Sequence, residues 1–307
     1  LDTWEVISEA EYQALLPVCG KALPTMAIST IKTDGEGNPE RAKYRIVALG
    51  NLDPHNWEKS DCFAPVLSQA ELRLLTALAT RKGRKLKSCD VSQAFCQSYL
   101  PENEVYVCTP PHGCPITPKG SLWRLRKTLY GLRRSPRHWY DKCKKILLEM
   151  GFKQCPNSPC LFTGVLIEGQ PPIYLGVYVD DIAYYSESDE VEQLFEKEFG
   201  QKVKTKFNGI VDYFLGIKFT YRDNKDGSLS VYLTQEAFID NLVKQFKLDG
   251  AGVGAPLTPY RSGMPVDKVK LDGFDSSLTP ARIHLLQSMV GCLTWLSTST
   301  RPDIATI

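Results

Sequence analysis

Two adjacent aspartates, Asp180 and Asp181, interrupt an otherwise apolar stretch of the sequence. The runs on either side, Ile173–Val179 and Ile182–Ser186, are rich in β-branched and aromatic residues, and two such runs around a short polar centre predict a β-hairpin. A carboxylate pair at the tip of a buried hairpin needs a compensating cation, because burying an unpaired charge is costly. Mg²⁺ suits the pair, since it takes oxygen ligands and shares them with waters and phosphates. The alternative is a solvent-facing turn, which is common for this dipeptide; the apolar flanks favour the metal site.

A third carboxylate is expected close by, because one hairpin supplies too few ligands for two metal ions. Asp90 ends a strand predicted for Lys85–Val91 and precedes a helix of small and aromatic residues predicted to run through Tyr99. A carboxylate at a strand end can face the hairpin tip, and Asp90 could equally be the N-cap of that helix. Two ions about 4 Å apart, held by three aspartates, would activate a 3′-hydroxyl and stabilise the leaving pyrophosphate in an in-line phosphoryl transfer.

Other chemistries have little support in the sequence. The four histidines form no H-E-x-x-H pattern, and neither a G-x-S-x-G elbow nor a P-loop is present. The ten cysteines are scattered without a C-x-x-C pair, which predicts reduced thiols in a cytosolic setting rather than disulfides or a zinc site.

The bulk composition indicates a globular protein. The chain has 307 residues, of which 43% are hydrophobic and 23% are charged, and this length suits two or three packed subdomains that share one core. It contains no apolar run long enough to span a membrane, and its first residues include neither an initiator Met nor a signal region. We expect a piece of a longer polypeptide with no membrane partner.

Positive charge is concentrated in one stretch although the net charge is only +2. Leu122–Lys145 carries nine basic residues against one acidic residue, interleaved with Trp123, Tyr130, Trp139 and Tyr140. A solvated helix face is one explanation for such a run. The aromatic residues favour a polyanion partner, since rings can stack on bases beside cations that bind phosphates.

The periodicity of apolar residues predicts mixed secondary structure. Ser68 followed by Glu71 is a capping-box pattern at the start of a helix. The stretch Asp249–Asp275 is rich in Gly and Pro and is the best candidate for a linker. Further helices are predicted at Glu5–Leu16, Ser68–Thr80, Ser135–Met150, Asp189–Phe199, Gln235–Leu248 and Pro280–Ser297. A hairpin is predicted at Ile28–Arg41, with strands at Ala42–Gly50, Val105–Cys108, Leu122–Arg126, Val203–Phe207, Tyr213–Arg222 and Leu229–Thr234.

Seven short motifs, taken in order, resemble those of one known family. They are Lys43–Gly50, Phe63–Val66, Cys89–Phe95, Leu129–Trp139, Tyr178–Asp181, Phe214–Ile217 and Thr300–Ile304. Together they resemble the reverse transcriptase domain of the Pol polyprotein of copia-type (Pseudoviridae) LTR retrotransposons. The sequence departs from the family pattern at Leu49, at Arg134, where Gln is usual, and at Cys96–Ser98. These departures concern phosphate contacts and local packing rather than the carboxylates.

The resemblance implies an α+β fold of the right-hand polymerase type, with fingers, palm and thumb and an antiparallel palm sheet packed on helices. Residues 1–84 would form the N-terminal extension and fingers, 85–104 the first catalytic strand of the palm, and 105–150 fingers and palm with the basic helix. Residues 151–222 would form the palm with the Tyr178-Val179-Asp180-Asp181 hairpin and the primer grip, and 223–307 the thumb and the start of the connection. No RNase H domain is expected.

The resemblance also implies roles for individual residues. Asp90, Asp180 and Asp181 would be the catalytic, metal-binding carboxylates, joined by the backbone carbonyl of Val91. Phe95 would be the gate that excludes a ribose 2′-hydroxyl, with core packing as the alternative. The implied deoxynucleotide-binding residues are Lys43, Arg45, Phe95, Tyr130, Gly131 and Lys206. The implied primer grip is Phe214, Leu215 and Gly216, and the implied nucleic-acid contacts are Arg133, Arg134, Arg137 and Tyr178.

The implied function is RNA- and DNA-templated DNA synthesis on a primer with two Mg²⁺ ions, for which Mn²⁺ could substitute. Its partners would be template, primer and deoxynucleotide, with a second copy or other Pol domains such as RNase H and integrase left open, and its location would be cytoplasmic virus-like particles or the nucleus. Two alternatives are a catalytically silent nucleic-acid-binding scaffold and an RNA-dependent RNA polymerase. The three retained carboxylates count against the scaffold, and Phe95 counts against the RNA polymerase.

Overall fold

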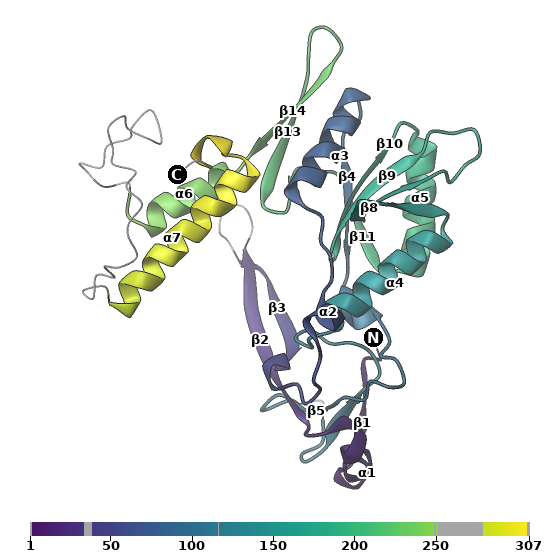
Figure 1. Ribbon diagram of the computed structural model, residues 1–307, viewed down its shortest axis with the longest axis vertical. Coiled ribbons are helices and arrows are strands. Elements are labelled where there is room, and N and C mark those ends of the chain that lie inside the picture. Colours follow the sequence, from purple (N-terminus) through teal and green to yellow (C-terminus); the bar gives the residue numbers. More distant parts are fainter. Residues whose placement is uncertain (1, 34–38, 116, 249, 251–278, 306–307) are drawn as a thin grey trace. The chain divides into compact units, whose positions relative to one another are not determined.

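The structure is a computed structural model that describes residues 2–33, 39–115, 117–248, 250 and 279–305. The chain divides into two compact units. The first consists of Leu1–Glu71 and Leu86–Gly209, and the second of Leu72–Lys85 and Ile210–Ile307. The elements of both units are labelled in Figure 1.

A six-stranded sheet forms the centre of the first unit, with the strand order β11-β4-β10-β9-β8-β7. Every pairing from β4 to β7 is antiparallel. Helices α4 and α5 pack against this sheet (Figure 1), because their apolar faces join the inward side chains of the strands in one core. The strands are β4 (Lys87–Val91), β7 (Phe152–Cys155), β8 (Ser158–Gly164), β9 (Ile173–Tyr178), β10 (Asp181–Ser186) and β11 (Thr205–Ile210), and the helices are α4 (Ser135–Glu149) and α5 (Asp189–Lys202).

The core beneath this sheet is apolar and closely packed. Trp139 and Leu147 of α4 and Phe195 of α5 are buried against Leu175 and Ile182 of the sheet. Burial of side chains of this size contributes roughly 1.5–3 kcal/mol each. This core fixes the position of the strand ends that carry the aspartates.

A second sheet of the first unit has the order β1-β6-β5-β2-β3. Its long hairpin, β2 (Leu23–Thr33) with β3 (Pro39–Ala48), is paired antiparallel throughout, whereas β2 and β5 run parallel. The other strands are β1 (Trp4–Ile7), β5 (Val107–Thr109) and β6 (Leu122–Leu125). Short helices complete the unit: α1 (Glu9–Cys19), η1 (Gly50–Leu52), α2 (Lys59–Cys62) and η2 (Ala94–Gln97).

The second unit contains the three-stranded sheet β12-β13-β14 and helices α6 and α7. Most of helix α3 also belongs to it, and the Arg73 guanidinium of that helix donates to the carbonyls of Thr298 and Ser299 in the last turn of α7. Such donors satisfy carbonyls that have no partner within a helix end. Its elements are α3 (Gln69–Arg81), β12 (Tyr213–Phe214), β13 (Ile217–Asp223), β14 (Leu229–Thr234), α6 (Glu236–Gln245), α7 (Pro280–Ser299) and η3 (Pro302–Ile304).

Most of the predicted elements are confirmed, as is the α+β class with an antiparallel sheet on helices. The capping box of α3 is present, since the backbone N–H of Ser68 donates to the Glu71 carboxylate at 2.6 Å and the Glu71 N–H donates to Ser68 Oγ at 3.2 Å. The hairpin of β9 and β10 is also present. The predicted linker Asp249–Asp275 lies outside the described residues apart from Gly250.

Three predictions of local structure are wrong. The predicted helix Glu5–Leu16 is a strand followed by a helix, because residues 4–7 pair with β6 before the capping box of Ser8 and Glu11 starts α1. The helix predicted after Asp90 is only the 3₁₀ turn η2. The predicted strand Tyr213–Arg222 is interrupted at Leu215 and Gly216, whose φ values of 50° and 74° turn the chain back between β12 and β13.

A close backbone approach at Gly131 joins β3 to the segment that leads into α4. The Ala48 N–H donates to the Tyr130 carbonyl at 2.7 Å, and Gly131 has a φ of 91°. A Cβ atom at Gly131 would lie 2.0 Å from the carbonyl oxygen of Ala48. Only glycine fits, because both the backbone conformation and the space exclude a side chain.

We predict that Gly131→Ala destabilises the protein by at least about 3 kcal/mol, because steric overlap adds to the strain of a positive φ. Gly151→Ala is the matched control, since Gly151 has a φ of 88° but nothing within 4 Å of the position that a methyl group would take; it should cost about 1 kcal/mol. Urea unfolding of both variants measures the difference. Equal losses of stability would contradict the prediction.

Candidate active site

The register of the central sheet brings the three aspartates together. Asp181 of β10 pairs directly with Asp90 of β4, so the two side chains emerge on the same face with Cβ atoms about 4.5–5.5 Å apart. Asp180 lies in the turn before β10, and its carbonyl accepts a 2.7 Å hydrogen bond from the Val91 N–H. The N-cap alternative for Asp90 is wrong, because Asp90 is a strand residue and Gln93 occupies the N-cap of η2.

The aspartates are half-buried and repel one another. Burial, followed by the charges of Asp180 and Asp90, raises the pKa of Asp181 to about 6. Burial also raises the pKa of Asp180, with a further increase from Asp90 that Lys43 and Arg45 partly offset. Half-burial and the raised pKa values count against the solvent-facing alternative for this pair, and the site favours a positive charge at this point.

The donor set fits magnesium. It consists of carboxylate oxygens, the ligands that Mg²⁺ takes, and a cation would relieve the repulsion that raises the two pKa values. Within the described part of the chain, no three His, Cys, Asp or Glu side chains are grouped closely enough to hold a metal ion by themselves. Mg²⁺ commonly takes only one or two protein carboxylates and completes its coordination with water or phosphate oxygens.

A cavity of about 760 Å³ adjoins the aspartates. Asp90, Asp180, Lys43, Arg45 and Tyr130 are among the residues that line it. The Arg45 guanidinium lies 5.9 Å from the centre of the Tyr130 ring, within the range of a cation–π interaction. The cavity thus brings cations and carboxylates together, an arrangement that suits a ligand with both phosphates and a bound cation.

Phe95 is not among the lining residues of this cavity, but it packs on Tyr130, which lines it. The two ring centroids are 5.1 Å apart with planes tilted by 58°, a geometry that aromatic pairs favour. Phe95 also packs against the core of the central sheet. The core-packing alternative is thus confirmed, and the gate role stays a prediction that this packing does not contradict.

The cavity has lining residues that the sequence did not single out. Asp2, Thr3 and Trp4 of the N-terminal segment line it, and Trp4 stacks on Trp123 with ring centroids 4.3 Å apart. Lys204 also lines it, whereas Lys206, the predicted nucleotide contact, is not among its lining residues and is exposed on β11. In the sequence, the only indication that this segment lines the cavity was its cluster of lysines at positions 202–206.

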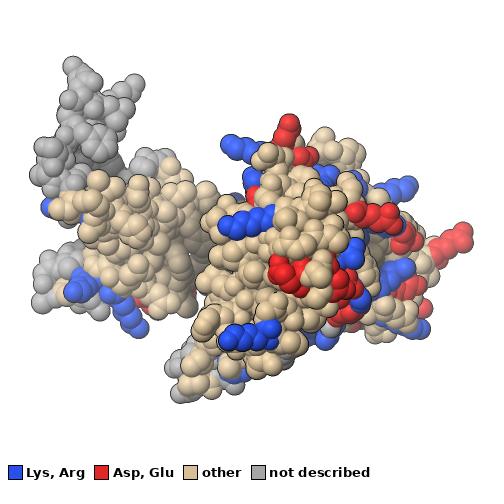
Figure 2. All heavy atoms as spheres, turned by 90° about the horizontal axis from the view of Figure 1, so that it is seen from below, with Lys and Arg blue, Asp and Glu red and all other residues tan. Residues whose placement is uncertain are grey.

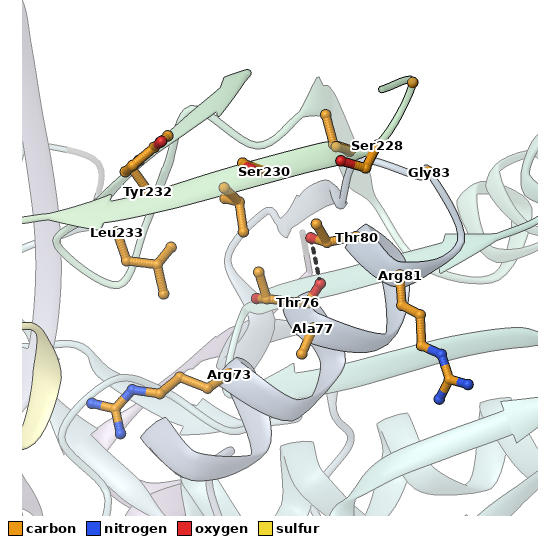
Figure 3. Close-up of a pocket in the computed structure, with 13 residues that line it drawn as sticks. Arg73, Thr76, Ala77, Thr80, Arg81, Gly83, Ser228, Ser230, Tyr232 and Leu233 are labelled. Atoms are coloured by element: carbon orange, nitrogen blue, oxygen red, sulfur yellow. Dashed lines mark hydrogen bonds between the residues drawn. The ribbon is translucent and has the colours of Figure 1, made fainter. Parts of the chain in front are cut away.

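A second cavity, of about 650 Å³, lies in the second unit between α3 and β14. Figure 3 shows Thr76 and Thr80 toward the strand, while the guanidinium groups of Arg73 and Arg81 point away from it. Among the described residues that line this cavity, none is Asp, Glu, His or Cys. Its walls offer no acid, base or nucleophile from those residue types, so it is not a candidate for catalysis.

Sequence comparison assigns the family. The model of a family described as reverse transcriptase (RNA-dependent DNA polymerase) matches residues 2–259. The chain belongs to the reverse transcriptase family. Among its relatives are the retrovirus-related Pol polyprotein from transposon RE1 of Arabidopsis thaliana, 29% identical over 91% of this chain, and that from transposon TNT 1-94 of Nicotiana tabacum, 25% identical over 94%. The chain is thus a reverse transcriptase domain of the copia type, and its enzyme class is RNA-directed DNA polymerase.

The relatives are much longer proteins. This reverse transcriptase domain spans 18% of the RE1 polyprotein and 21% of the TNT 1-94 polyprotein. It is also similar to solved structures of a foamy viral protease-reverse transcriptase in complex with an RNA/DNA hybrid and with dsDNA, with identities of 14% and 16%. These matches cover 95% and 94% of this chain and 28% and 48% of the solved chains, with TM-scores of 0.40 and 0.41, so the family assignment rests on the family model that matches residues 2–259.

Much of the basic stretch of the reverse transcriptase domain is neutralised within the first unit. Arg124 and Arg126 form ion pairs with Glu5 of β1, and Arg126 also pairs with Asp2. On the face seen in Figure 2, acidic and basic side chains are interspersed rather than gathered in one basic field. The sequence excess of positive charge at Leu122–Lys145 therefore overstates the free positive charge of that surface.

The predicted nucleic-acid contacts differ in their surroundings. Arg134 pairs with the buried carboxylate of Glu104, and its guanidinium lies 4.5 Å from the ring centre of Trp57. Its charge is therefore engaged by partners within the protein. Arg137 pairs with Asp141 at 2.7 Å, and Arg133 is exposed. Tyr178 lies half-buried at the end of β9, directly opposite Asp181.

The predicted primer-grip residues belong to the second unit. Phe214 is buried, and Leu215 and Gly216 form the turn between β12 and β13.

No described helix has both the length and the apolar character needed to cross a membrane.

We predict that Asp181→Asn stabilises the metal-free protein at pH 7.5 by on the order of 2 kcal/mol, since one pKa unit corresponds to about 1.4 kcal/mol. The folded pKa of Asp181, about 6, exceeds the ordinary aspartate value of 3.8. The Asp181 contribution to stability is therefore full below pH 4 and is lost as the pH rises through 6. The gain should shrink to zero at pH 4 in urea unfolding with a chelator; an undiminished gain at pH 4 would contradict this cause.

Proposed function

We propose that this reverse transcriptase domain extends the 3′ end of a primer by nucleotidyl transfer, copying an RNA or DNA template into DNA. The observation that carries the proposal is the pairing of Asp181 with Asp90 at the sheet end, beside a cavity that Lys43 and Arg45 also line. Carboxylates that hold metal ions, facing cations that bind phosphates, form the arrangement that phosphoryl transfer requires.

The three aspartates and the backbone carbonyl of Val91 would hold two Mg²⁺ ions, and Mn²⁺ could replace them because it prefers similar ligands. When bound, the ions would make the primer hydroxyl more acidic and neutralise charge on the leaving pyrophosphate. The raised pKa of Asp181 is a property of the metal-free site, so proton and metal would compete for the same carboxylates.

The protein side chains around the cavity would bind and orient the nucleotide. Lys43 would meet the triphosphate as a compact charge and Arg45 as a two-pronged donor. Tyr130 would support the base or sugar, held in place by Arg45 and Phe95. Phe95 would exclude a ribose 2′-hydroxyl, because its ring leaves no room for the extra oxygen.

The proposed substrate is a primer annealed to a template, and for the parent element the template would be retrotransposon RNA copied into cDNA. The relatives whose Pol polyproteins contain such a domain support this context. Arg133, Arg137 and Tyr178 are the remaining candidates for contact with the nucleic acid, since Arg134 already pairs with Glu104.

We predict that Asp180→Asn with Asp181→Asn lowers primer extension on poly(rA)/oligo(dT) by at least about a thousandfold, because the metal ions supply several kcal/mol of transition-state stabilisation. Glu168→Gln is the control, since Glu168 is an exposed carboxylate in the turn between β8 and β9 of the same sheet. It should retain wild-type activity. Unchanged extension by the double variant would sink the metal-site assignment, and tight duplex binding by an inactive wild type would instead favour the silent scaffold.

We predict that Phe95→Ala lowers the preference for deoxynucleotides over ribonucleotides by about tenfold or more, since the space left by the ring admits the 2′-hydroxyl. Phe95→Tyr retains the ring and should retain the preference. The measurement is the ratio of kcat/KM for dTTP and UTP on one primer–template. If both variants discriminate like the wild type, Phe95 has no gate role.

A further inference from the structure

The tip of the β9–β10 hairpin is held in a conformation that its residues do not favour. Tyr178 pairs with Asp181, so Val179 and Asp180 form a two-residue turn. Val179 has a φ of 54°, a region that β-branched residues rarely adopt. A positive φ at the first central residue alone is typical of a type II′ turn, where glycine is usual. Contacts outside the hairpin must therefore stabilise this turn.

The structure provides one such contact from helix α4. The indole N–H of Trp139 donates to the Val179 carbonyl at 2.6 Å. Trp139 is 1% exposed and belongs to the core of the central sheet, against which Val179 also packs. Because the ring is fixed by that core, its N–H acts as a rigid donor aimed at the turn.

The next carbonyl of the turn is held from the opposite strand. The Val91 N–H donates to the Asp180 carbonyl at 2.7 Å, and Val91 follows Asp90 directly in the sequence. The peptide on each side of the Asp180 Cα is thus fixed by a different element, one by α4 and one by β4. Release of the Trp139 bond would free one of these two constraints and allow the turn to relax.

We propose that Trp139 is a positioning residue that maintains the left-handed conformation of Val179 and thereby aligns Asp180 and Asp181 with Asp90 for metal binding. Trp139 touches neither the metal nor the nucleotide in this proposal. The inference rests on the proposed function, because it assumes that these aspartates bind the metal ions.

The test uses Trp139→Phe, which keeps an aromatic ring and removes the donor. Trp123→Phe is the matched control, since Trp123 is also fully buried and its indole N–H donates at 2.9 Å to Thr117 Oγ1 in a different core of the same unit. Mn²⁺ binding is measured by electron paramagnetic resonance without nucleotide or nucleic acid. Trp139→Phe should weaken Mn²⁺ binding by roughly three- to tenfold, the net value of one hydrogen bond, and Trp123→Phe by less than twofold.

A second variant tests the link to the strained turn. Val179→Gly removes the strain, because glycine adopts a positive φ readily, so the further change Trp139→Phe should then weaken Mn²⁺ binding by less than twofold. If Trp139→Phe alone fails to fold, folding of the double variant supports the proposal, and failure of both overturns it. Equal Mn²⁺ affinities for Trp139→Phe and Trp123→Phe, or an undiminished effect in the glycine background, also overturns it.

The Asp180→Asn and Asp181→Asn variant separates the two levels of inference. If this variant binds Mn²⁺ as tightly as the wild type, the proposed metal site itself fails. If it loses Mn²⁺ binding while Trp139→Phe retains full affinity, the metal site stands and only the positioning role of Trp139 fails.

Discussion

The mutual repulsion of Asp90, Asp180 and Asp181 is the constraint on which the rest of the site depends. Burial and like charge raise the pKa of Asp181 to about 6, so the metal-free fold holds these groups together against an unfavourable interaction. The backbone hydrogen bonds between β4 and β10 oppose that repulsion. A cation removes it, which couples cation binding to the stability of the sheet end.

One apolar core positions both parts of the site. Phe95, which packs on Tyr130 of the cavity wall, and Val179 at the hairpin tip pack against the same buried cluster, which includes Trp139 and Val91. Protein cores are close-packed, so a change of volume there is transmitted rather than absorbed. Phe95 and the turn that carries Asp180 therefore share a common support, although they are far apart in the sequence.

Charge in the first unit is balanced locally before any ligand arrives. The N-terminal strand β1 supplies Glu5 to Arg124 and Arg126, and the buried Glu104 carboxylate accepts both Arg134 and, at 2.9 Å, His138. Pairing of this kind makes burial of a carboxylate tolerable. Most cations that line the cavity come instead from β3, which approaches the backbone closely at Gly131, and Lys204 adds another.

Features encoded within a short window were determined by the sequence itself: the capping box of Ser68 and Glu71, the apolar hairpin around Asp180 and Asp181, and the motifs of the family. Features that depend on distant pairing were decided only by the tertiary structure. Glu5 became a strand residue because β6 pairs with it, and Arg134 became an internal ion-pair partner because the fold brings Glu104 to it. Asp90 could have been a helix cap until the register set it opposite Asp181 in the sheet. The physical reason is that local propensity acts through neighbouring residues, whereas strand register and ion pairing depend on the packing of the whole unit.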